Sequence, residues 1–375
     1  MVDALTLVGL LFVAFAGGAL GAALGAYPAF ALSGLVVAVG EIARATGGSV
    51  PTSAPDPLAL GTAGVTANVG LGPVFGPHVV FGGGAAAAAY AARKGYLDTG
   101  FDYYEAKNVT YSLGARADVL AVGGAFGVAG LLLAALAAGS LGVGGGLPWP
   151  ALPLDPVMAS VVLSAFLHRL AFGYPLVGNV RGDVLDMTPY ERDERRRPVV
   201  DSGEASGGSG IGPEADAVGR YVVEPWLPHQ SRWGGVALLG ASAGVFGAFV
   251  AYVSGSALLA FGIAAASTLL LSLGMERAPV THHMVLPASI LVVGLADGAT
   301  DPSVIASSLS LPVAVVAGAL AGALAGAVGE LAQRVLYAHA DTHFDPPAAS
   351  IVVTTFLLGL LDVVGLISQN VVPTP

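Results

Sequence analysis

Long apolar runs that carry almost no charge dominate the sequence. One of them, ALTLVGLLFVAFAGGALGAAL, begins at residue 4 and contains no charged residue. Of the 375 residues, 55% are hydrophobic and 11% are charged, whereas soluble domains average about 25% charged residues. A helix of about 20 apolar residues crosses the hydrocarbon core of a bilayer, and these runs are continuous rather than alternating. The sequence therefore predicts an all-α, polytopic integral membrane helix bundle.

Hydropathy and length divide the chain into ten predicted spans. Tyr27-Pro28 leaves open whether the first two spans are separate helices or one kinked helix, because proline interrupts the hydrogen-bond ladder of a helix. The predicted spans are 4–26, 29–45, 74–92, 117–139, 156–176, 234–253, 256–275, 283–299, 309–337 and 346–367.

Basic residues mark one side of this predicted bundle. All of the 15 Lys and Arg residues except Arg44 fall in or beside four loops, at 93–116, 178–233, 276–282 and 338–345. Cytoplasmic loops carry an excess of Lys and Arg, so we expect these loops to be cytoplasmic in a cell (plasma) membrane protein. The Gly/Ser-rich part of 178–233 is typical of a flexible linker, whereas RYVVEPWLPHQ is expected to pack on the membrane face.

A repeated phrase relates the two ends of the chain. LDPVMASVVLSAFL begins at residue 154 and FDPPAASIVVTTFL begins at residue 344, and half of their positions are identical. The phrase predicts an internal duplication, with repeat 1 at 1–177, the polar linker at 178–233 and repeat 2 at 234–375. Because each repeat holds five spans, the two must be inverted in the membrane, as in many secondary transporters.

Each phrase contains Asp-Pro at the start of an apolar run, at Asp155 and Asp345. An aspartate at the N-cap accepts hydrogen bonds from the first turn of a helix, and proline at the next position loses none. We therefore expect two capped helix starts, each near a membrane interface. Since the carboxylates offset the positive end of each helix dipole, the alternative to a purely structural role is a site for a cation or proton rather than an anion.

Four other residues are candidates for a solute or ion pathway. His78 and His283 occupy similar positions before the third and eighth spans, and His168 and Arg169 lie deeper in the fifth. Ionisable residues inside a membrane are costly and are often functional. His168 and Arg169 have no obvious partner in their own helix, so a functional role and a structural role stay equally open.

The segment HADTHFD offers a possible metal site. His339 and His343 are four positions apart, which places them on one face of a continuing helix, and Asp341 lies between them. Imidazole and carboxylate ligands suit several divalent metals. The alternative is that these are ordinary polar residues at a helix end.

Glycines spaced four apart predict close helix packing, at Gly17, Gly21 and Gly25 and again at Gly318, Gly322 and Gly326. Other signatures are missing from the sequence. There is no cysteine, no GxxxxGK[ST] loop and no recognisable set of nucleophile, base and orienting group. We therefore expect no enzyme activity, no cofactor and no nucleic-acid partner; a homo-oligomer stays open.

The composition also resembles a known group of proteins. Only Lys94 and Lys107 are lysines, the formal net charge is −10, and Ala, Gly and Val are abundant. In these respects the chain resembles uncharacterised multi-pass membrane proteins of haloarchaea, a family of unknown function. The inverted repeat predicts a transporter or channel for a small solute or ion. The alternative is a non-transporting membrane scaffold whose cytoplasmic linker recruits a partner.

Overall fold

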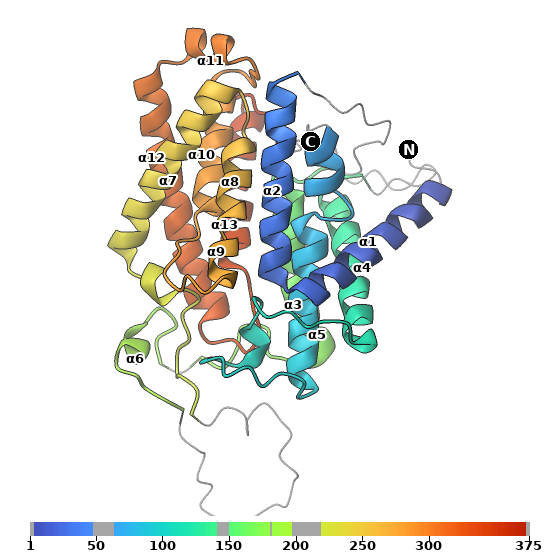
Figure 1. Cartoon of the computed structure of the whole chain (residues 1–375). Coiled ribbons are helices and arrows are strands. Elements are labelled where there is room, and N and C mark those ends of the chain that lie inside the picture. The colour runs from blue at the N-terminus through green and yellow to red at the C-terminus, as the bar shows by residue number, and fades with distance from the viewer. Residues whose placement is uncertain (1–3, 48–63, 141–149, 181, 197–218, 373–375) are drawn as a thin grey trace, which may run out of the picture.

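The computed structural model describes residues 4–47, 64–140, 150–180, 182–196 and 219–372. These residues form helices and loops, and the described part of the chain contains no strand beyond one isolated bridge between Arg195 and Tyr221. Figure 1 shows the helices of residues 4–172, in blue to green, beside those of residues 233–363, in yellow to red. The predicted all-α fold class is confirmed.

Helix occupies each of the ten predicted ranges. In the first half of the chain these helices are α1 (Ala4–Leu24), α2 (Ala26–Ala45), α3 (Pro77–Arg93), α4 (Ala117–Ala137) and α5 (Pro156–Phe172). In the second half they are α7 (Trp233–Ser254), α8 (Leu259–Ala266), α9 (Leu269–Ser272), α10 (His282–Leu295), α12 (Leu311–Ala332) with its π-helical extension η5 (Gln333–Tyr337), and α13 (Pro346–Val363).

Six of these helices are long and apolar enough to cross a membrane: α1, α2, α4, α7, α12 with η5, and α13. This set indicates an integral membrane protein. The helices α5 and α10 and the pair α8–α9 are apolar but shorter. The predicted span at 256–275 is divided into α8 and α9, and the predicted span at 283–299 ends early, at Leu295. A count of ten spans therefore stays a prediction.

The first two helices separate at Gly25 rather than at Tyr27-Pro28. Gly25 has a φ of 91°, a left-handed conformation that glycine adopts without steric cost. Pro28 instead lies in the first turn of α2, where its missing N–H would have had no partner in the helix. The segment 4–45 is thus two helices, and the proline is accommodated because it follows the break so closely.

Each half of the chain is built around a glycine-lined pair of helices. In the first half α1 packs on α3 and α4, and in the second half α7 packs on α10 and α12. Gly18 lies directly against the backbone of Gly123 and Gly127, and Gly244 lies in the same way against Gly318 and Gly322. A Cβ at any of these positions would collide with backbone atoms, so glycine permits the close approach of the helices.

The predicted packing glycines occupy several different environments. Gly17 and Gly21 face the backbone of Val74 and Val80, while Gly25 forms the helix break just described. Gly318, Gly322 and Gly326 all face α7, where Gly326 lies beside Val236. Five of the six therefore lie at helix contacts.

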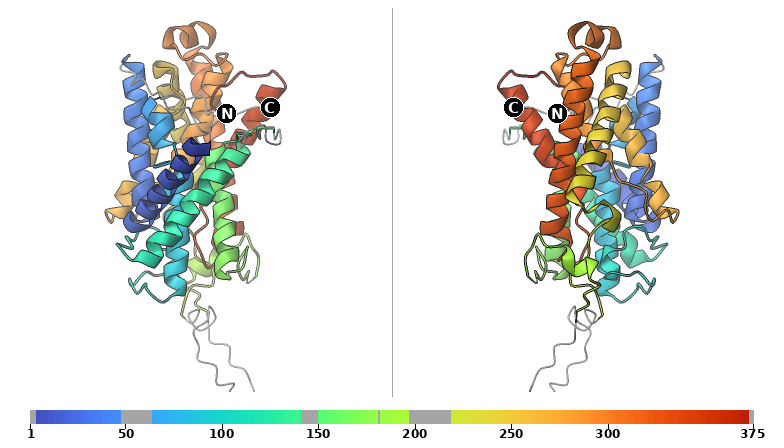
Figure 2. Two further views of the ribbon diagram at one scale, coloured as in Figure 1. Left: turned by 90° about the vertical axis from the view of Figure 1, so that its right-hand side faces the viewer. Right: turned by 90° about the vertical axis from the view of Figure 1, so that its left-hand side faces the viewer.

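The two halves meet mainly through α2, which contacts α8 and α9, and through α5, which contacts α13. The basic-rich loops gather at one end of the bundle, the lower end in Figure 1, together with the short helix α6 (Thr188–Glu191). The short helix α11 (Pro302–Ser308) lies at the opposite end. We call the end with the basic loops the inner end and the end with α11 the outer end. Figure 2 shows the same separation from two further sides.

The end of the polar linker packs against the bundle, as the sequence predicts. The Gln230 side chain exchanges two hydrogen bonds with the backbone of Val280, at 2.8 and 2.9 Å. The Trp226 N–H donates to Oε1 of Gln333 at 2.9 Å. The Gly/Ser-rich part, predicted to be flexible, lies in 197–218 and so outside the described residues.

Candidate functional site

The helices α5 and α13 lie antiparallel where the two halves meet. The N–H of Asp155, at the start of α5, donates to Oγ1 of Thr355 in the middle of α13, at 3.0 Å. Reciprocally, Phe344 and Asp345, at the start of α13, lie beside Ala165 in the middle of α5. Each helix therefore starts about halfway along the other, inside the bundle. The expectation that both starts lie near a membrane interface stays a prediction.

Both aspartates are N-caps, as their sequence context predicts. Oδ1 of Asp155 accepts from the Met158 N–H at 2.9 Å, and Oδ2 of Asp345 accepts from the Ala348 N–H at 2.9 Å. Asp155 is partly buried, while Asp345 is only 7% exposed. In each carboxylate the second oxygen is left for other interactions.

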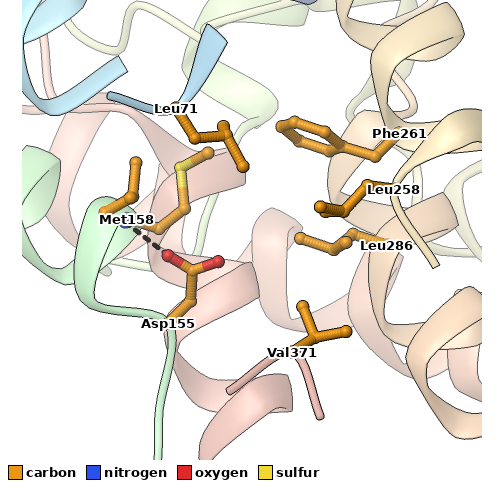
Figure 3. A pocket seen from close by; sticks show the side chains of 8 residues that line it. Leu71, Asp155, Met158, Leu258, Phe261, Leu286 and Val371 are labelled. Carbon is orange, nitrogen blue, oxygen red and sulfur yellow. Dashed lines mark hydrogen bonds between the residues drawn. The ribbon is translucent and has the colours of Figure 1, made fainter. Parts of the chain in front are cut away.

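The second oxygen of Asp155 faces an apolar cavity, which we call the outer pocket (Figure 3). Across this pocket from Asp155 lie Leu258, Phe261 and Leu286 of the second half. No other charged group lines it among the described residues. The full lining is Leu71, Asp155, Val157, Met158, Leu258, Phe261, Leu286 and Val371.

Two further cavities continue from the outer pocket toward the inner end. Met158 lines both the outer pocket and a middle pocket, whose other lining residues are Tyr27, Phe30, Pro77, Phe81, Val161 and Asp345. The middle pocket shares Phe81, Val161 and Asp345 with an inner pocket, completed by Gly82, Ala85, Ser164, Ala165, His168 and His343. Each cavity has room for about one water molecule. A chain of small cavities thus runs from Asp155 to Asp345 and His343.

Polar side chains converge on the inner pocket. Ser164, His168 and His343 are each at most 2% exposed. Oγ of Ser164, Nδ1 of His168 and both ring nitrogens of His343 have no hydrogen-bond partner among the described residues. The closest polar approach is from Nε2 of His343 to Oδ1 of Asp345, at 3.6 Å. Buried polar atoms are rarely left without partners, so these atoms are available to bond a small polar guest.

Arg169 fastens one wall of the inner pocket. Its guanidinium is fully buried and donates to Oγ1 of Thr342 at 2.9 Å, to the Thr342 carbonyl at 3.2 Å, and to the carbonyls of Leu176 and Leu336. Nε2 of His168 lies 3.1 Å from the same Thr342 hydroxyl. Arg169 therefore holds α5 to the segment before α13, and with it the position of His343.

A cluster of buried ions lies beside the inner pocket at the inner end. Nζ of Lys107 lies 2.8 Å from Glu224, and neither side chain is exposed. Arg220 bonds both Glu224, at 2.8 and 2.9 Å, and Asp341, at 3.0 Å. Nζ of Lys107 also lies 4.5 Å from the ring centre of Tyr337. We call Lys107, Arg220, Glu224 and Asp341 the inner ion cluster.

The charges of this cluster depend on one another. Burial lowers the pKa of Lys107 to about 8, although Glu224 beside it acts in the opposite direction. Burial raises the pKa of Glu224, but Lys107 and Arg220 outweigh it and leave that pKa below its usual value. Removing one partner would leave the other charged group buried and unpaired. The cluster therefore joins the loop before α4, the end of the linker and the segment before α13.

The predicted metal ligands do not form a ligand set. Nε2 of His339 lies 3.2 Å from the Val184 carbonyl, Asp341 is bound by Arg220, and His343 approaches Asp345. Within the described ranges no three histidine or acidic residues are grouped so that they could hold a metal ion. The prediction of a metal site at His339, Asp341 and His343 is left without support.

The remaining predicted pathway residues fall into two groups. His168 lines the inner pocket, and Arg169 positions it. His78 and His283 are buried in the first turns of α3 and α10, but they do not line the three pockets. The structure therefore brings together Asp345, His168 and His343 and places Asp155 at the other end of the cavity chain. His78 and His283 lie outside these cavities.

Sequence reasoning missed Ser164, Lys107 and Glu224. Ser164 lies four positions before His168, so the two share a helix face, and that spacing could have identified it. Lys107 and Glu224 lie in two loops whose sequence is typical of solvent-exposed charged side chains. Their burial follows from contacts between distant segments, for which the sequence carries no local signal.

Comparisons with known proteins agree with the absence of recognisable motifs. No curated protein and no solved structure matches the chain. One family model matches residues 1–375, the whole chain, and its description is a family of unknown function, DUF7973. The protein therefore belongs to the DUF7973 family, whose function is unknown.

Proposed function

We propose that the protein is a membrane transporter or channel that moves a small solute or ion along the interface between its two halves. The observation that carries this proposal is the chain of three cavities between Asp155 and Asp345. Ligand sites in many secondary transporters lie near the midplane, at the interface of two repeats. Since each cavity takes about one water molecule, the structure corresponds to a closed state of this route.

Matching contacts in the two halves support the inverted repeat that underlies the proposal. The Ser160 hydroxyl donates to the carbonyl of Gly130 at 2.7 Å, joining α5 to α4. The Ser350 hydroxyl, at the same place in the second phrase, donates to the carbonyl of Ala325 at 2.6 Å, joining α13 to α12. The pair α1 and α4 packs through glycine as the pair α7 and α12 does. Similar residues thus make similar contacts.

The packing order extends this correspondence. If α1 to α5 are matched in order with α7, α8–α9, α10, α12 and α13, every helix contact between α3, α4 and α5 has its counterpart between α10, α12 and α13. The contacts between the halves, α2 with α8 and α5 with α13, join matched helices to each other. This is the pattern expected from a two-fold axis between the halves. In our proposal ten helices span the plasma membrane, with the basic inner end in the cytoplasm.

Cysteine labelling tests the route, because the chain has no native cysteine. Met158 lines both the outer and the middle pocket, so a thiol reagent on Met158→Cys should block flux of a permeant probe in proteoliposomes. The panel of probes is Na⁺, K⁺, Cl⁻, H⁺ and small uncharged metabolites. Met275→Cys, at a methionine that is 54% exposed, should react without changing flux. No flux of any probe through the unlabelled protein would overturn the proposal.

A second labelling experiment tests the inverted orientation. Leu152 lies just before α5 and is 37% exposed, and Leu185, beside the segment before α13, is 41% exposed. Cysteines at these two positions should react from opposite sides of sealed vesicles. Reaction of both from one side would contradict the inverted repeat.

A further inference from the structure

The inner pocket differs from the rest of the proposed route in its polar lining. It holds one carboxylate, two imidazoles and one hydroxyl, contributed by α5, the segment before α13 and the start of α13. A Cβ at Gly82 would lie only 3.3 Å from Oγ of Ser164, a tight contact, so glycine allows α3 to lie close to this hydroxyl. The polar atoms therefore face a shared cavity rather than one another.

The hydrogen bonds around His168 indicate which of its ring nitrogens carries the proton. The Thr342 hydroxyl accepts from Nε of Arg169 at 2.9 Å and lies 3.1 Å from Nε2 of His168. Arginine can only donate, so the hydroxyl best uses its own proton by donating it to Nε2 of His168. A neutral His168 then carries its proton on Nδ1, the nitrogen without a partner among the described residues. This tautomer is assigned from the hydrogen-bond network.

The opposite side of the cavity offers acceptors. Oδ2 of Asp345 accepts from the Ala348 N–H, while Oδ1 lies 3.6 Å from Nε2 of His343. A water molecule in the pocket can accept from His168 and donate to Asp345. The site therefore suits a guest that both donates and accepts, which describes a water molecule better than it describes a metal ion or an anion.

We propose that the inner pocket is a proton-binding site, in which Asp345 takes up a proton relayed from solvent hydronium through a water molecule held by His168, Ser164 and His343, and that flux is driven by or consists of protons. This inference rests on the proposed transport function for its second part only. The proton adds to Oδ1 of Asp345 and leaves as hydronium, so no other reactant is needed.

Titratable groups from several elements surround Asp345 and His343. Tyr27 from α2, Arg169 from α5, Lys107 from the loop before α4 and Tyr337 from η5 are the other titratable groups near the pair of Asp345 and His343. From α3 only Phe81, Gly82 and Ala85 face the pocket. Burial lowers the pKa of His343, although Asp345 beside it acts in the opposite direction.

The first test measures proton binding without transport. Infrared difference spectra of the detergent-purified full chain, recorded between acidic and neutral pH, should contain a buried carboxylic acid band that Asp345→Asn removes. Asparagine caps a helix as well as aspartate does, so the helix start is retained. The matched control is Asp301→Asn, since Asp301 is an exposed cap before a proline and accepts from the Ser303 N–H at 2.8 Å. This control should keep the band, and His343→Gln should shift its pH midpoint.

The second test measures flux. Proteoliposomes that contain a trapped pH dye should acidify under an imposed pH gradient, and Asp345→Asn should abolish the signal while Asp301→Asn keeps it. A titrating band without any flux leaves the proton site standing and overturns the transport proposal. Flux of another solute that is independent of pH, with no band lost in Asp345→Asn, leaves transport standing and overturns the proton site.

Discussion

The outer and inner pockets lie at the starts of two similar helices, yet they differ sharply in chemistry. In the outer pocket Asp155 faces Leu258, Phe261 and Leu286. In the inner pocket Asp345 is accompanied by Ser164, His168 and His343. Both aspartates cap their helices in the same way. The capped start is therefore the part shared by the two ends, and the polar lining belongs to one end only.

Matched positions in the two phrases show how this difference arises. The place of His168 in α5 is taken in α13 by Leu358, and the place of Arg169 is taken by Gly359. Gly359 packs closely on Pro153, so the outer end is fastened by backbone contact. The inner end is fastened by Arg169 and by the inner ion cluster. Four predictions test this comparison between an inner end held by buried charge and an outer end held by other contacts.

The largest effect is expected from Glu224→Gln, which leaves Lys107 buried without its partner. Breaking a buried ion pair from one side costs about 3–5 kcal/mol, measured as a loss in the free energy of unfolding in detergent. At the outer end Glu41 accepts from Thr66 at 2.9 Å, from Ser256 at 2.6 Å and from Arg44 at 3.1 Å, but Arg44 is partly exposed and would stay solvated without its partner. Glu41→Gln should therefore cost less, about 1–3 kcal/mol.

The double variant Lys107→Met, Glu224→Leu provides the control for this prediction. Replacing both buried ions by apolar side chains of similar volume is often neutral, so most of the lost stability should return. Equal costs for Glu41→Gln and Glu224→Gln would remove the distinction between the two ends.

The second prediction concerns the feature that the two halves share. Gly18→Ala and Gly244→Ala each place a methyl group against backbone of the paired helix. Overpacking of this kind costs about 1–3 kcal/mol, and we expect similar losses in thermal unfolding for both variants. Gly9→Ala is the control, because no atom lies within 4 Å of a Cβ at that position, and it should not destabilise the protein. A loss in one half alone would argue against a shared packing scheme.

These features differ in how far the sequence could predict them. The helix ranges and both Asp-Pro caps follow from local patterns, namely apolar length and the chemistry of a first turn, and the structure has helix in every predicted range. The predicted break, at Tyr27-Pro28, lies two residues after the observed break at Gly25. Proline gives a stronger sequence signal than a glycine whose φ is set by packing. Local pattern therefore predicts where helices start and end.

The site depends on contacts that no local pattern contains. Arg169 and Thr342 lie in different halves of the chain, and so do Lys107 and Glu224. Asp341 and His343, close in sequence, have different partners, so their spacing alone does not bring them together. The sequence identifies both Asp155 and Asp345. It does not show that polar side chains surround Asp345 while apolar side chains surround Asp155.

The third prediction uses pH to examine the inner end. Burial lowers the pKa of Lys107 to about 8 in the folded protein, whereas an unfolded lysine has a pKa of about 10.4. Between these two pKa values the unfolded state binds more protons than the folded state. The free energy of unfolding therefore rises with pH, by on the order of 1 kcal/mol between pH 8 and pH 9. Thermal melting across this range measures it. The slope should vanish in Lys107→Met, and a slope unchanged by that substitution would assign the effect to another group.

The smallest effect is expected at the outer pocket. Asn caps a helix about as well as Asp does, so Asp155→Asn keeps the bond from the Met158 N–H and should change the free energy of unfolding by only a few tenths of a kcal/mol. Asp155→Ala removes the cap and should cost about 1 kcal/mol. The comparison is made by chemical unfolding in detergent, with Asp301→Asn and Asp301→Ala as the exposed pair of controls. If Asp155→Asn were as costly as Asp155→Ala, the charge of Asp155 and not its capping bond would hold the outer end closed, and the two ends would be alike in depending on a buried ion.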